Sequence, residues 1–137
     1  MKKILLLDDD TDLRSLIHRG LQKAGYDITE GADGKAGLKL FAQAKFDLVL
    51  TDIIMPETDG LELISALRKI SPDIPIIAMS GGGFIQSQDY LRVAELTGAS
   101  WILNKPFKLG ELFALVARAL TESTQTASGT SALAENG

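Results

Sequence analysis

Short strand-like segments alternate with segments of helical period along most of this chain, and that alternation restricts the folds open to it. The strand-like segments lie at residues 3–7, 27–30, 46–51, 74–79 and 101–104. Each is followed by a stretch with apolar residues every three or four positions, within residues 11–24, 33–42, 61–67, 87–96 and 112–120. Most of the strands are apolar without alternation, as in parallel strands buried on both faces. The pattern predicts an α/β fold, doubly wound, with helices on both faces of a parallel sheet.

The ends of these segments carry residues suited to caps and turns. Asp10 or Thr11 can cap the first helix and Asp33 the second, because a short polar side chain can accept a hydrogen bond from a free backbone N–H. Gly25 supplies a stop for the first helix. The least apolar strand, at residues 27–30, is expected at or near an edge of the sheet.

Length and composition exclude several classes of protein. The 137 residues suit one domain, and a formal net charge of −4 gives no sign of the basic patch that nucleic-acid binding requires. With no cysteine and one histidine, His18, neither a disulfide nor a cysteine or histidine metal site is possible. The apolar run at residues 4–7 is too short for a signal peptide, and no run approaches the ~18 residues of a membrane helix. We expect a cytoplasmic protein that binds neither nucleic acid nor membrane directly.

The last segment differs in composition from the rest of the chain. Residues 121–137 are rich in Ser, Thr, Ala and Gly and almost lack large apolar side chains. Such a segment buries too little surface to offset the entropy of ordering it. We therefore expect a folded domain over residues 1–120 and a disordered tail or linker over residues 121–137.

Polar residues follow four of the predicted strands at their carboxyl ends: Asp8 and Asp9, Asp52, Ser80, and Lys105. In an open parallel sheet these ends meet at one edge, where ligands bind. Carboxylates packed together repel one another, and Mg²⁺ would relieve that repulsion because it prefers carboxylate oxygens and waters. With an aspartate as nucleophile and a lysine for the phosphoryl oxygens, the set predicts phosphoryl transfer to an aspartate.

Taken singly, each of these residues is common in a solvated loop, a turn or a helix cap, so the prediction rests on their joint placement. Asp10 is assigned to the helix cap and left out of the site. His18 is expected on the surface of the first helix, away from this edge and without a role.

The ordered set of motifs resembles a known family, the receiver domain of bacterial response regulators. The motifs are D-D at 8–9, D-x-x-M-P-x-x-D-G at 52–60, S-G at 80–81 and K-P-F at 105–107. The resemblance covers residues 2–120. It implies the flavodoxin-like fold of chemotaxis regulators, with five parallel strands in the order 2-1-3-4-5, and a role as a switch in two-component signalling.

The resemblance also implies a role for each site residue. Asp52 would be the phosphoacceptor, with Ser80 and Lys105 in contact with the phosphoryl group. The Mg²⁺ ligands would be Asp8, mainly through water, Asp9, Asp52 and the backbone carbonyl of Ile54. The bond between Lys105 and Pro106 would be cis.

The partners follow from the same resemblance. The phosphodonor would be a sensor histidine kinase or a histidine phosphotransfer protein. The phosphorylated domain would bind a downstream protein through its fourth helix, last strand and fifth helix. It would act as a monomer or a phosphorylation-dependent dimer. Its own chemistry would be limited to self-phosphorylation from small donors and slow self-dephosphorylation, so it would not be an enzyme in the ordinary sense.

Two positions depart from the family pattern. Many receivers have Tyr or Phe three residues before the lysine, where this chain has Ile102, and the neighbouring Trp101 points to the opposite face of the sheet. The switch would then depend on Ser80 and on movement of the loop at residues 81–83 with the fourth helix. Ile54, two residues after the acceptor, cannot orient water by hydrogen bonding, which predicts a long-lived phosphoryl group.

Other functions fit parts of the same pattern. One alternative is that the chain is a fragment, the N-terminal receiver of a longer regulator whose output domain lies beyond Gly137, with residues 121–137 as the linker. A Mg²⁺-dependent phosphatase with an aspartyl nucleophile usually carries a second acid where this chain has Ile54. A receiver used only as a scaffold would lack a site residue, and none is missing.

Overall fold

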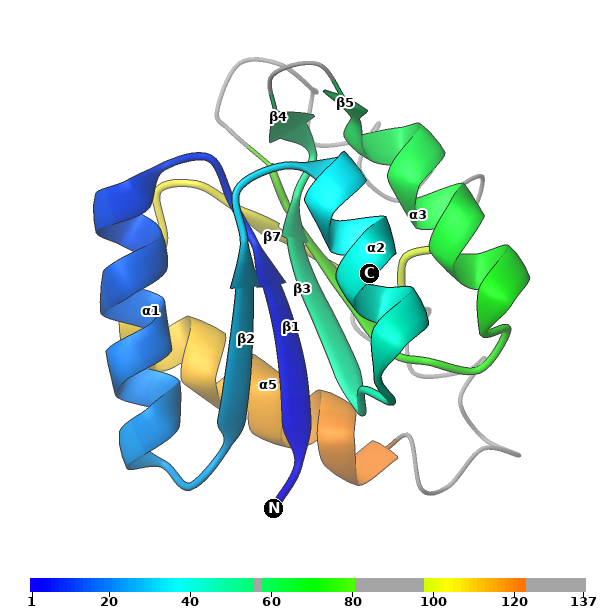
Figure 1. Ribbon diagram of the computed structural model, residues 1–137. Coiled ribbons are helices and arrows are strands. Elements are labelled where there is room, and N and C mark those ends of the chain that lie inside the picture. Colours follow the sequence, from blue (N-terminus) through cyan, green and yellow to red (C-terminus); the bar gives the residue numbers. More distant parts are fainter. Residues whose placement is uncertain (56–57, 81–97, 123–137) are drawn as a thin grey trace.

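The computed structural model of the chain describes residues 1–55, 58–80 and 98–122, and at 54–55, 58–61 and 80 it describes the backbone alone (Figure 1). Its helices are α1 (Thr11–Lys23), α2 (Gly34–Gln43), α3 (Gly60–Ile70) and α5 (Leu109–Glu122). Its strands are β1 (Lys3–Leu7), β2 (Asp27–Gly31), β3 (Leu48–Asp52), β4 (Ile54–Met55), β5 (Thr58–Asp59), β6 (Ile76–Ser80) and β7 (Trp101–Asn104).

Five parallel strands form the main sheet in the order β2-β1-β3-β6-β7. Because β6 and β7 are the fourth and fifth strands of this sheet along the chain, the expected order 2-1-3-4-5 is confirmed, as is the edge position of β2. All five strands run the same way, so their carboxyl ends gather at the edge drawn uppermost in Figure 1.

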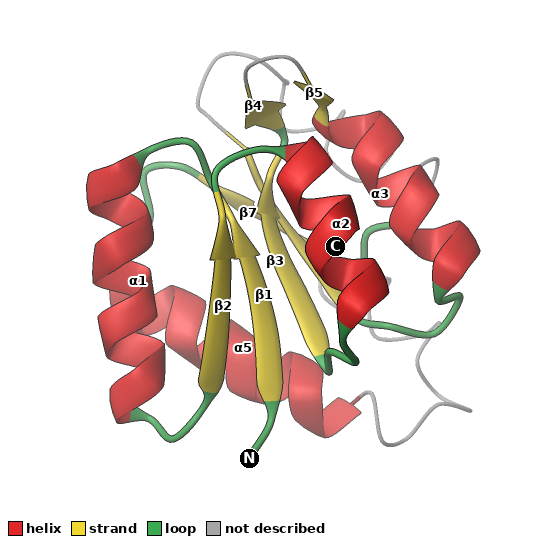
Figure 2. Ribbon diagram, viewed as in Figure 1, coloured by secondary structure: helices red, strands yellow, loops and turns green. Residues whose placement is uncertain are grey.

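Helices cover both faces of the sheet, with α1 and α5 on one side and α2 and α3 on the other (Figure 2). Successive side chains of a strand point to opposite faces. In β1, Ile4 and Leu6 pack with the residues of α1 and α5, whereas Leu5 and Leu7 pack with those of α2 and α3, and all four are fully buried. Each such burial contributes about 1.5–3 kcal/mol, so β1 is fixed from both sides.

Close packing extends to the carboxyl end of β1. Leu7 lies against Gly31 and Gly37, and a Cβ at Gly37 would clash with the Leu7 side chain. Glycine at position 37 therefore lets α2 approach the last residue of β1. Leu7 directly precedes Asp8, so this contact helps to fix where the acidic loop begins.

The predicted helix caps are present. The Asp10 carboxylate accepts a hydrogen bond from the Leu13 N–H at 3.1 Å, and the Asp33 carboxylate accepts one from the Ala36 N–H at 2.8 Å. Gly25 follows α1 with a φ of +99°, a conformation that favours glycine. Asp10, rather than Thr11, is thus the cap of the first helix.

Several boundaries differ from those predicted. Strand β3 begins at Leu48 rather than at residue 46, and β6 spans Ile76–Ser80 rather than 74–79. A short antiparallel pair, β4 with β5, lies where the sequence indicated only a loop. Helix α5 continues to Glu122, two residues past the predicted domain end. The predicted helix at 87–96 and the rest of the tail, 123–137, lie outside the described residues.

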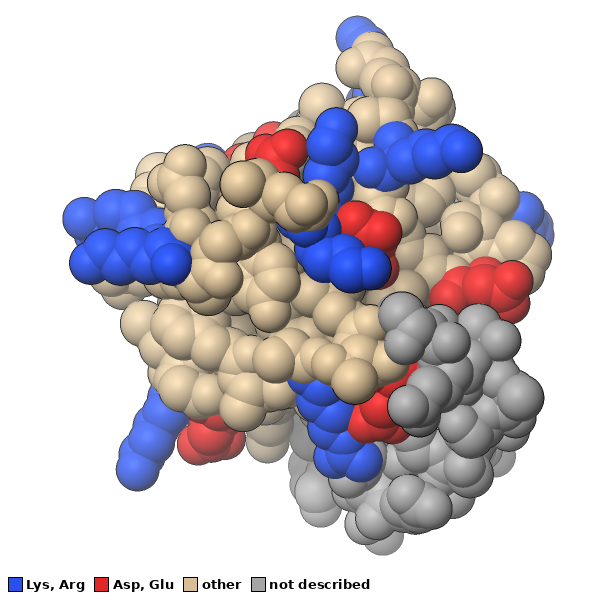
Figure 3. All heavy atoms as spheres, turned by 90° about the horizontal axis from the view of Figure 1, so that it is seen from below, with Lys and Arg blue, Asp and Glu red and all other residues tan. Residues whose placement is uncertain are grey.

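The amino-terminal edge of the sheet carries charges of both signs. Seen from below (Figure 3), the visible basic side chains are interspersed with acidic ones rather than gathered in one stripe. Among the described residues, none of the helices is both long and apolar enough to span a membrane.

Candidate functional site

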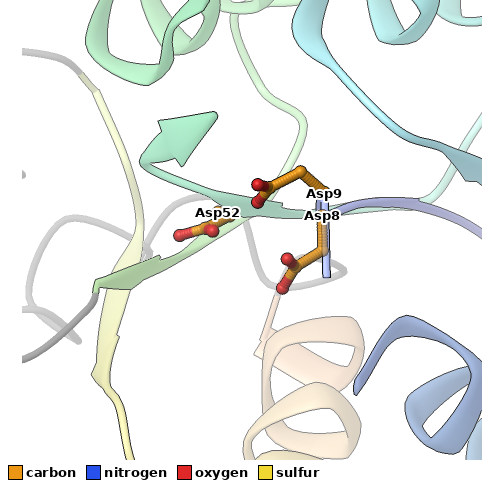
Figure 4. Close-up of side chains that lie close together, drawn as sticks. All are labelled: Asp8, Asp9 and Asp52. Carbon is orange, nitrogen blue, oxygen red and sulfur yellow. The ribbon is translucent and has the colours of Figure 1, made fainter. Parts of the chain in front are cut away.

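Three aspartates lie together at the carboxyl edge of the sheet (Figure 4). Asp8 and Asp9 directly follow β1, and Asp52 ends β3, which pairs with β1 up to Leu7 opposite Thr51. Their nearest carboxylate oxygens all lie within 4.8 Å of one another. Asp8 is completely buried, Asp52 is 5% exposed and Asp9 is exposed, so the cluster has one open side. The joint placement predicted from the strand ends is correct for these residues.

Lys105 reaches the same cluster from the loop between β7 and α5. Its Nζ atom lies 3.1 Å from Asp8 Oδ2 and 3.3 Å from Asp52 Oδ2. The bond between Lys105 and Pro106 is cis, as the resemblance implied. One ammonium group therefore donates to two buried carboxylates, one just after β1 and one at the end of β3.

The surroundings of Lys105 keep it protonated. Burial lowers the pKa of the ammonium, but hydrogen bonds to Asp8 and Asp52 and the negative charge of both carboxylates outweigh that effect, and the pKa is raised above its ordinary value. At neutral pH, Lys105 is thus a permanent positive charge in the cluster.

One ammonium does not balance three carboxylates. Two unit charges about 4 Å apart in partly buried surroundings interact by about 4 kcal/mol, a large fraction of the whole stability of a small domain. A divalent cation would remove the imbalance, and a compact group of carboxylate oxygens with one open side suits Mg²⁺, which keeps several waters. The donor set at this edge therefore fits a magnesium ion.

The backbone around these carboxylates is held by hydrogen bonds. The Asp8 N–H donates to the Gly31 carbonyl at 3.2 Å, and Asp8 Oδ1 accepts from the Asp10 N–H at 2.9 Å. In β3, the buried hydroxyl of Thr51 donates to the carbonyl of Asp52 at 3.0 Å. The site is therefore built on rigid strand ends rather than on a long loop.

Two predicted site residues are described only in part. Ser80 is the last residue of β6 and pairs with Asn104, and Ile54 begins β4 and pairs with Asp59. Both are near the carboxyl edge in sequence and topology. The side chain of Ser80 and that of Ile54 lie outside the described part of the structure.

A second ionic cluster, which the sequence did not indicate, adjoins the acidic one. Glu30 of β2 accepts a hydrogen bond from Arg14 Nε at 2.6 Å and also contacts His18 Nδ1, both from α1. His18 was expected to be a surface residue, but its side chain is half-buried and contacts Glu30. These residues are 12 and 16 positions from Glu30, a separation that matches no motif, so only the packing of α1 beside β2 brings them together.

Trp101 and Ile102 of β7 lie on opposite faces of the sheet, as expected. Trp101 is buried on the face covered by α1 and α5, whereas Ile102 is half-buried on the face covered by α2 and α3. Trp101 therefore does not stand in for the ring that many receivers carry at the position of Ile102.

With this geometry in place, comparison with known proteins decides the family. The family model for the response regulator receiver domain matches residues 4–117. The chain belongs to this family. The identity indicated by the motifs is thus confirmed, together with the five-stranded fold.

The relatives of this chain differ in how much of their length the receiver domain occupies. Response regulator receiver protein CpdR of Brucella abortus is 37% identical over 115 residues, covering 82% of this chain and 91% of that protein. DNA-binding transcriptional regulator NtrC of Bradyrhizobium sp. is 34% identical over 125 residues, covering 91% of this chain and 25% of that protein. The receiver thus spans about a quarter of the length of this NtrC.

A solved structure supports the same fold. The crystal structure of response regulator protein TrrA from Thermotoga maritima, in complex with Mg²⁺–BeF, matches with a TM-score of 0.75 and 33% identity. The match covers 87% of this chain and 99% of that one.

Proposed function

We propose that this receiver accepts a phosphoryl group on Asp52 and so acts as a switch in a two-component signalling system. One observation carries the proposal. Asp52 ends a central strand almost fully buried, within 4.8 Å of two further carboxylates and 3.3 Å from the ammonium of Lys105. A nucleophilic carboxylate, a cation site and a fixed positive charge are the parts that phosphoryl transfer to an aspartate requires.

The cation in this proposal is Mg²⁺. Asp9, Asp52 and the carbonyl of Ile54 would hold it, with Asp8 acting through water. When bound, Mg²⁺ would neutralise the carboxylates and stabilise negative charge on the phosphoryl oxygens. The unbalanced charge of the three aspartates supports this assignment, as does the Mg²⁺–BeF complex of the TrrA relative.

The transfer step leaves the phosphoryl group on Asp52 as an acyl phosphate. An Oδ atom of Asp52 forms the new bond to phosphorus while the P–N bond of a donor phosphohistidine breaks. The donor imidazole keeps the electron pair and takes up a proton. We assign to Lys105 Nζ, already beside Asp52 Oδ2, and to the hydroxyl of Ser80 the hydrogen bonds to phosphoryl oxygens after transfer.

The donor in this proposal is a sensor histidine kinase or a histidine phosphotransfer protein, acting in the cytoplasm. An open apolar hollow beside Lys105, lined by Leu13, Pro106 and Phe107, supports a protein donor. Apolar surface next to the acceptor gives a partner side chains to bind. The signal would then pass to a downstream protein through β7, α5 and the helix predicted near 87–96, with the domain a monomer or a phosphorylation-dependent dimer.

We also propose that the acyl phosphate is long-lived and that the domain's own chemistry is limited to self-phosphorylation and slow self-dephosphorylation. Ile54 has no group that could orient an attacking water. Replacing Ile54 with Asn is expected to raise the dephosphorylation rate, measured as loss of phosphoprotein after removal of the donor. An unchanged rate would contradict this part of the proposal.

Acetyl phosphate with Mg²⁺ tests the proposal directly. Intact-protein mass spectrometry is expected to show the gain of one phosphoryl group in the natural protein and none in Asp52→Asn. Chelation of the metal should abolish the gain, and Asp73→Asn, an exposed aspartate away from the site, should behave as the natural protein does. Phosphorylation of Asp52→Asn would refute the assignment of the acceptor.

A second candidate function is a receiver that controls an output domain in the same polypeptide. The NtrC relative supports it, because the receiver match covers only a quarter of that protein. The complete gene sequence decides between a single-domain receiver and this arrangement. The chemistry proposed for Asp52 is the same in both.

A further inference from the structure

Arg14 connects the two ionic clusters, although its side chain contacts no carboxylate of the acidic site. Its Nη1 donates a hydrogen bond to the backbone carbonyl of Asp8, and its Nε donates to Glu30 Oε1 at 2.6 Å. The side chain is 15% exposed, which makes it well shielded for an arginine. From these contacts we infer that Arg14 is a positioning residue that sets the Mg²⁺ affinity of the site, an inference that rests on the proposed function.

The contact matters because it completes the bonding of Asp8. The Asp8 N–H donates to Gly31, its carbonyl accepts from Arg14, and its carboxylate accepts from the Asp10 N–H and from Lys105. Asp8 is thereby fixed at its backbone and its side chain. Without Arg14, the carbonyl of Asp8 would lose a side-chain donor that ties it to α1.

Asp9 depends on this bonding because it has no anchor of its own in the described contacts. It is exposed and lies between Asp8 and Asp10, and the latter is fixed as the cap of α1. The peptide groups on either side therefore set the direction of the Asp9 Cα–Cβ bond, from which the carboxylate extends toward the site. Removing a group that contacts and orients a metal ligand, without touching the metal itself, typically weakens metal binding by about 10- to 100-fold.

Glu30 and His18 hold Arg14 in the orientation that this role requires. Glu30 lies on β2, opposite Leu6 of β1, so its carboxylate is carried by the sheet itself. One oxygen accepts from Arg14 and the other contacts His18 Nδ1. An arginine suits the position because its planar group can donate to a carboxylate and a carbonyl at once, whereas a lysine is a single point charge on a flexible stem.

A purely structural arginine would affect stability alone, so the test measures metal affinity and stability separately. Isothermal titration calorimetry with MgCl₂ gives the Kd of the purified full chain, and thermal unfolding without divalent cations gives Tm. The variants are Arg14→Gln, Arg14→Lys and Glu30→Gln. Arg19→Gln, an exposed arginine on the same helix, is the matched control.

We expect Arg14→Gln to weaken Mg²⁺ binding about tenfold, with Glu30→Gln and Arg14→Lys intermediate and Arg19→Gln unchanged. Phosphorylation by acetyl phosphate should slow in Arg14→Gln at low Mg²⁺ and recover at saturating Mg²⁺. If Arg14→Gln does not fold, Arg14→Lys and Glu30→Gln carry the test. A lower Tm with an unchanged Kd in these variants would overturn the inference and leave the proposed function intact. A natural protein that binds no Mg²⁺ would instead overturn the proposed metal site itself.

Discussion

The two ionic clusters at the end of β1 differ in charge balance. In the acidic cluster, three carboxylates face the single ammonium of Lys105, and Asp8 and Asp52 are buried. In the neighbouring cluster, one carboxylate, Glu30, accepts from the guanidinium of Arg14 and contacts an imidazole, and all three side chains are half-buried. The balanced cluster can be stable as it stands, whereas the unbalanced one requires a further cation.

The difference shows how the fold separates the binding site from its support. Buried like charges cost stability unless something compensates them, so such a cluster is retained where it has a use. The second cluster has no excess of carboxylates, which suits a supporting role. Asp8 belongs to both, through its carboxylate to the first and through its carbonyl to the second.

The largest effect is expected from removing the cation of the acidic cluster. Lys105→Met leaves the buried carboxylates of Asp8 and Asp52 without this partner, and breaking a buried pair in this way costs about 3–5 kcal/mol. Urea unfolding without divalent cations measures the loss. Mg²⁺ should restore part of it, because a bound cation supplies the missing positive charge.

Lys108→Met is the matched control, since Lys108 is exposed three residues further on. It should leave the unfolding free energy nearly unchanged. If Lys105→Met lowers the unfolding free energy no more than the control does, Lys105 does not offset repulsion among the three carboxylates, and the proposed charge imbalance is wrong.

Removing one carboxylate should have the opposite sign. Asp52→Asn relieves repulsion with two neighbouring acids at the loss of one contact with Lys105, so we expect a gain of about 1 kcal/mol in unfolding free energy without Mg²⁺. The same variant should gain less from added Mg²⁺ than the natural protein does. Asp12→Asn, an exposed aspartate on α1, is the control, and destabilisation of Asp52→Asn would contradict the proposed charge imbalance.

The two clusters should lose their contributions at opposite ends of the pH scale. Partial burial raises the pKa of Glu30, but hydrogen bonds and charge from Arg14 and His18 outweigh it, so the pKa lies below its ordinary value of 4.5. Its stabilisation is complete above about pH 4.5 and is lost as the pH falls through the lowered pKa. The pKa of Lys105 is raised above 10.5, so its stabilisation is complete below that pH and is lost as the pH rises further.

Urea unfolding as a function of pH checks both directions. Glu30→Gln should reduce the loss of unfolding free energy at acid pH and leave the loss at alkaline pH unchanged. Lys105→Met should reduce the loss of unfolding free energy at alkaline pH. A Glu30→Gln profile parallel to that of the natural protein at acid pH would contradict the role of the Glu30 pair.

The smallest effect on stability is expected from replacing His18 in the second cluster. His18 is about a quarter exposed, and exposed pairs of this kind contribute about 0.2–1 kcal/mol. His18→Gln, which can still donate to Glu30, should change the unfolding free energy by less than about 0.5 kcal/mol. A loss as large as that of Arg14→Gln would show that His18, rather than Arg14, anchors Glu30.

The parts of the fold that depend on local pattern could be read from the sequence. Apolar runs such as residues 4–7 predicted the parallel strands. Asp8, Asp52 and Lys105 each follow such a run, and this position predicted that they meet at one edge of the sheet. Strand ends were less accurate because a strand is bounded by its hydrogen bonds rather than by hydrophobicity. Phe46 was assigned to β3, yet it precedes the strand and stacks on Phe41, with ring centroids 6.0 Å apart.

The parts that depend on tertiary packing could not be read in the same way. Leu16 falls on the apolar face of the helical pattern predicted within residues 11–24, but it is 45% exposed, whereas its neighbour Ile17 is fully buried. The β4–β5 pair has only two residues in each strand, too few for a pattern of period two. Arg14, Glu30 and His18 are separated polar residues with no motif, so their cluster emerges only from the three-dimensional arrangement.

The most direct test of the central claim identifies the residue that carries the phosphoryl group. The protein is treated with acetyl phosphate and Mg²⁺ and then reduced with borohydride, which converts an aspartyl phosphate into homoserine, and its peptides are sequenced by mass spectrometry. The expected result is homoserine at position 52 alone. Homoserine at position 8 or 9, or none at all under conditions in which Mg²⁺ binds, would contradict the account.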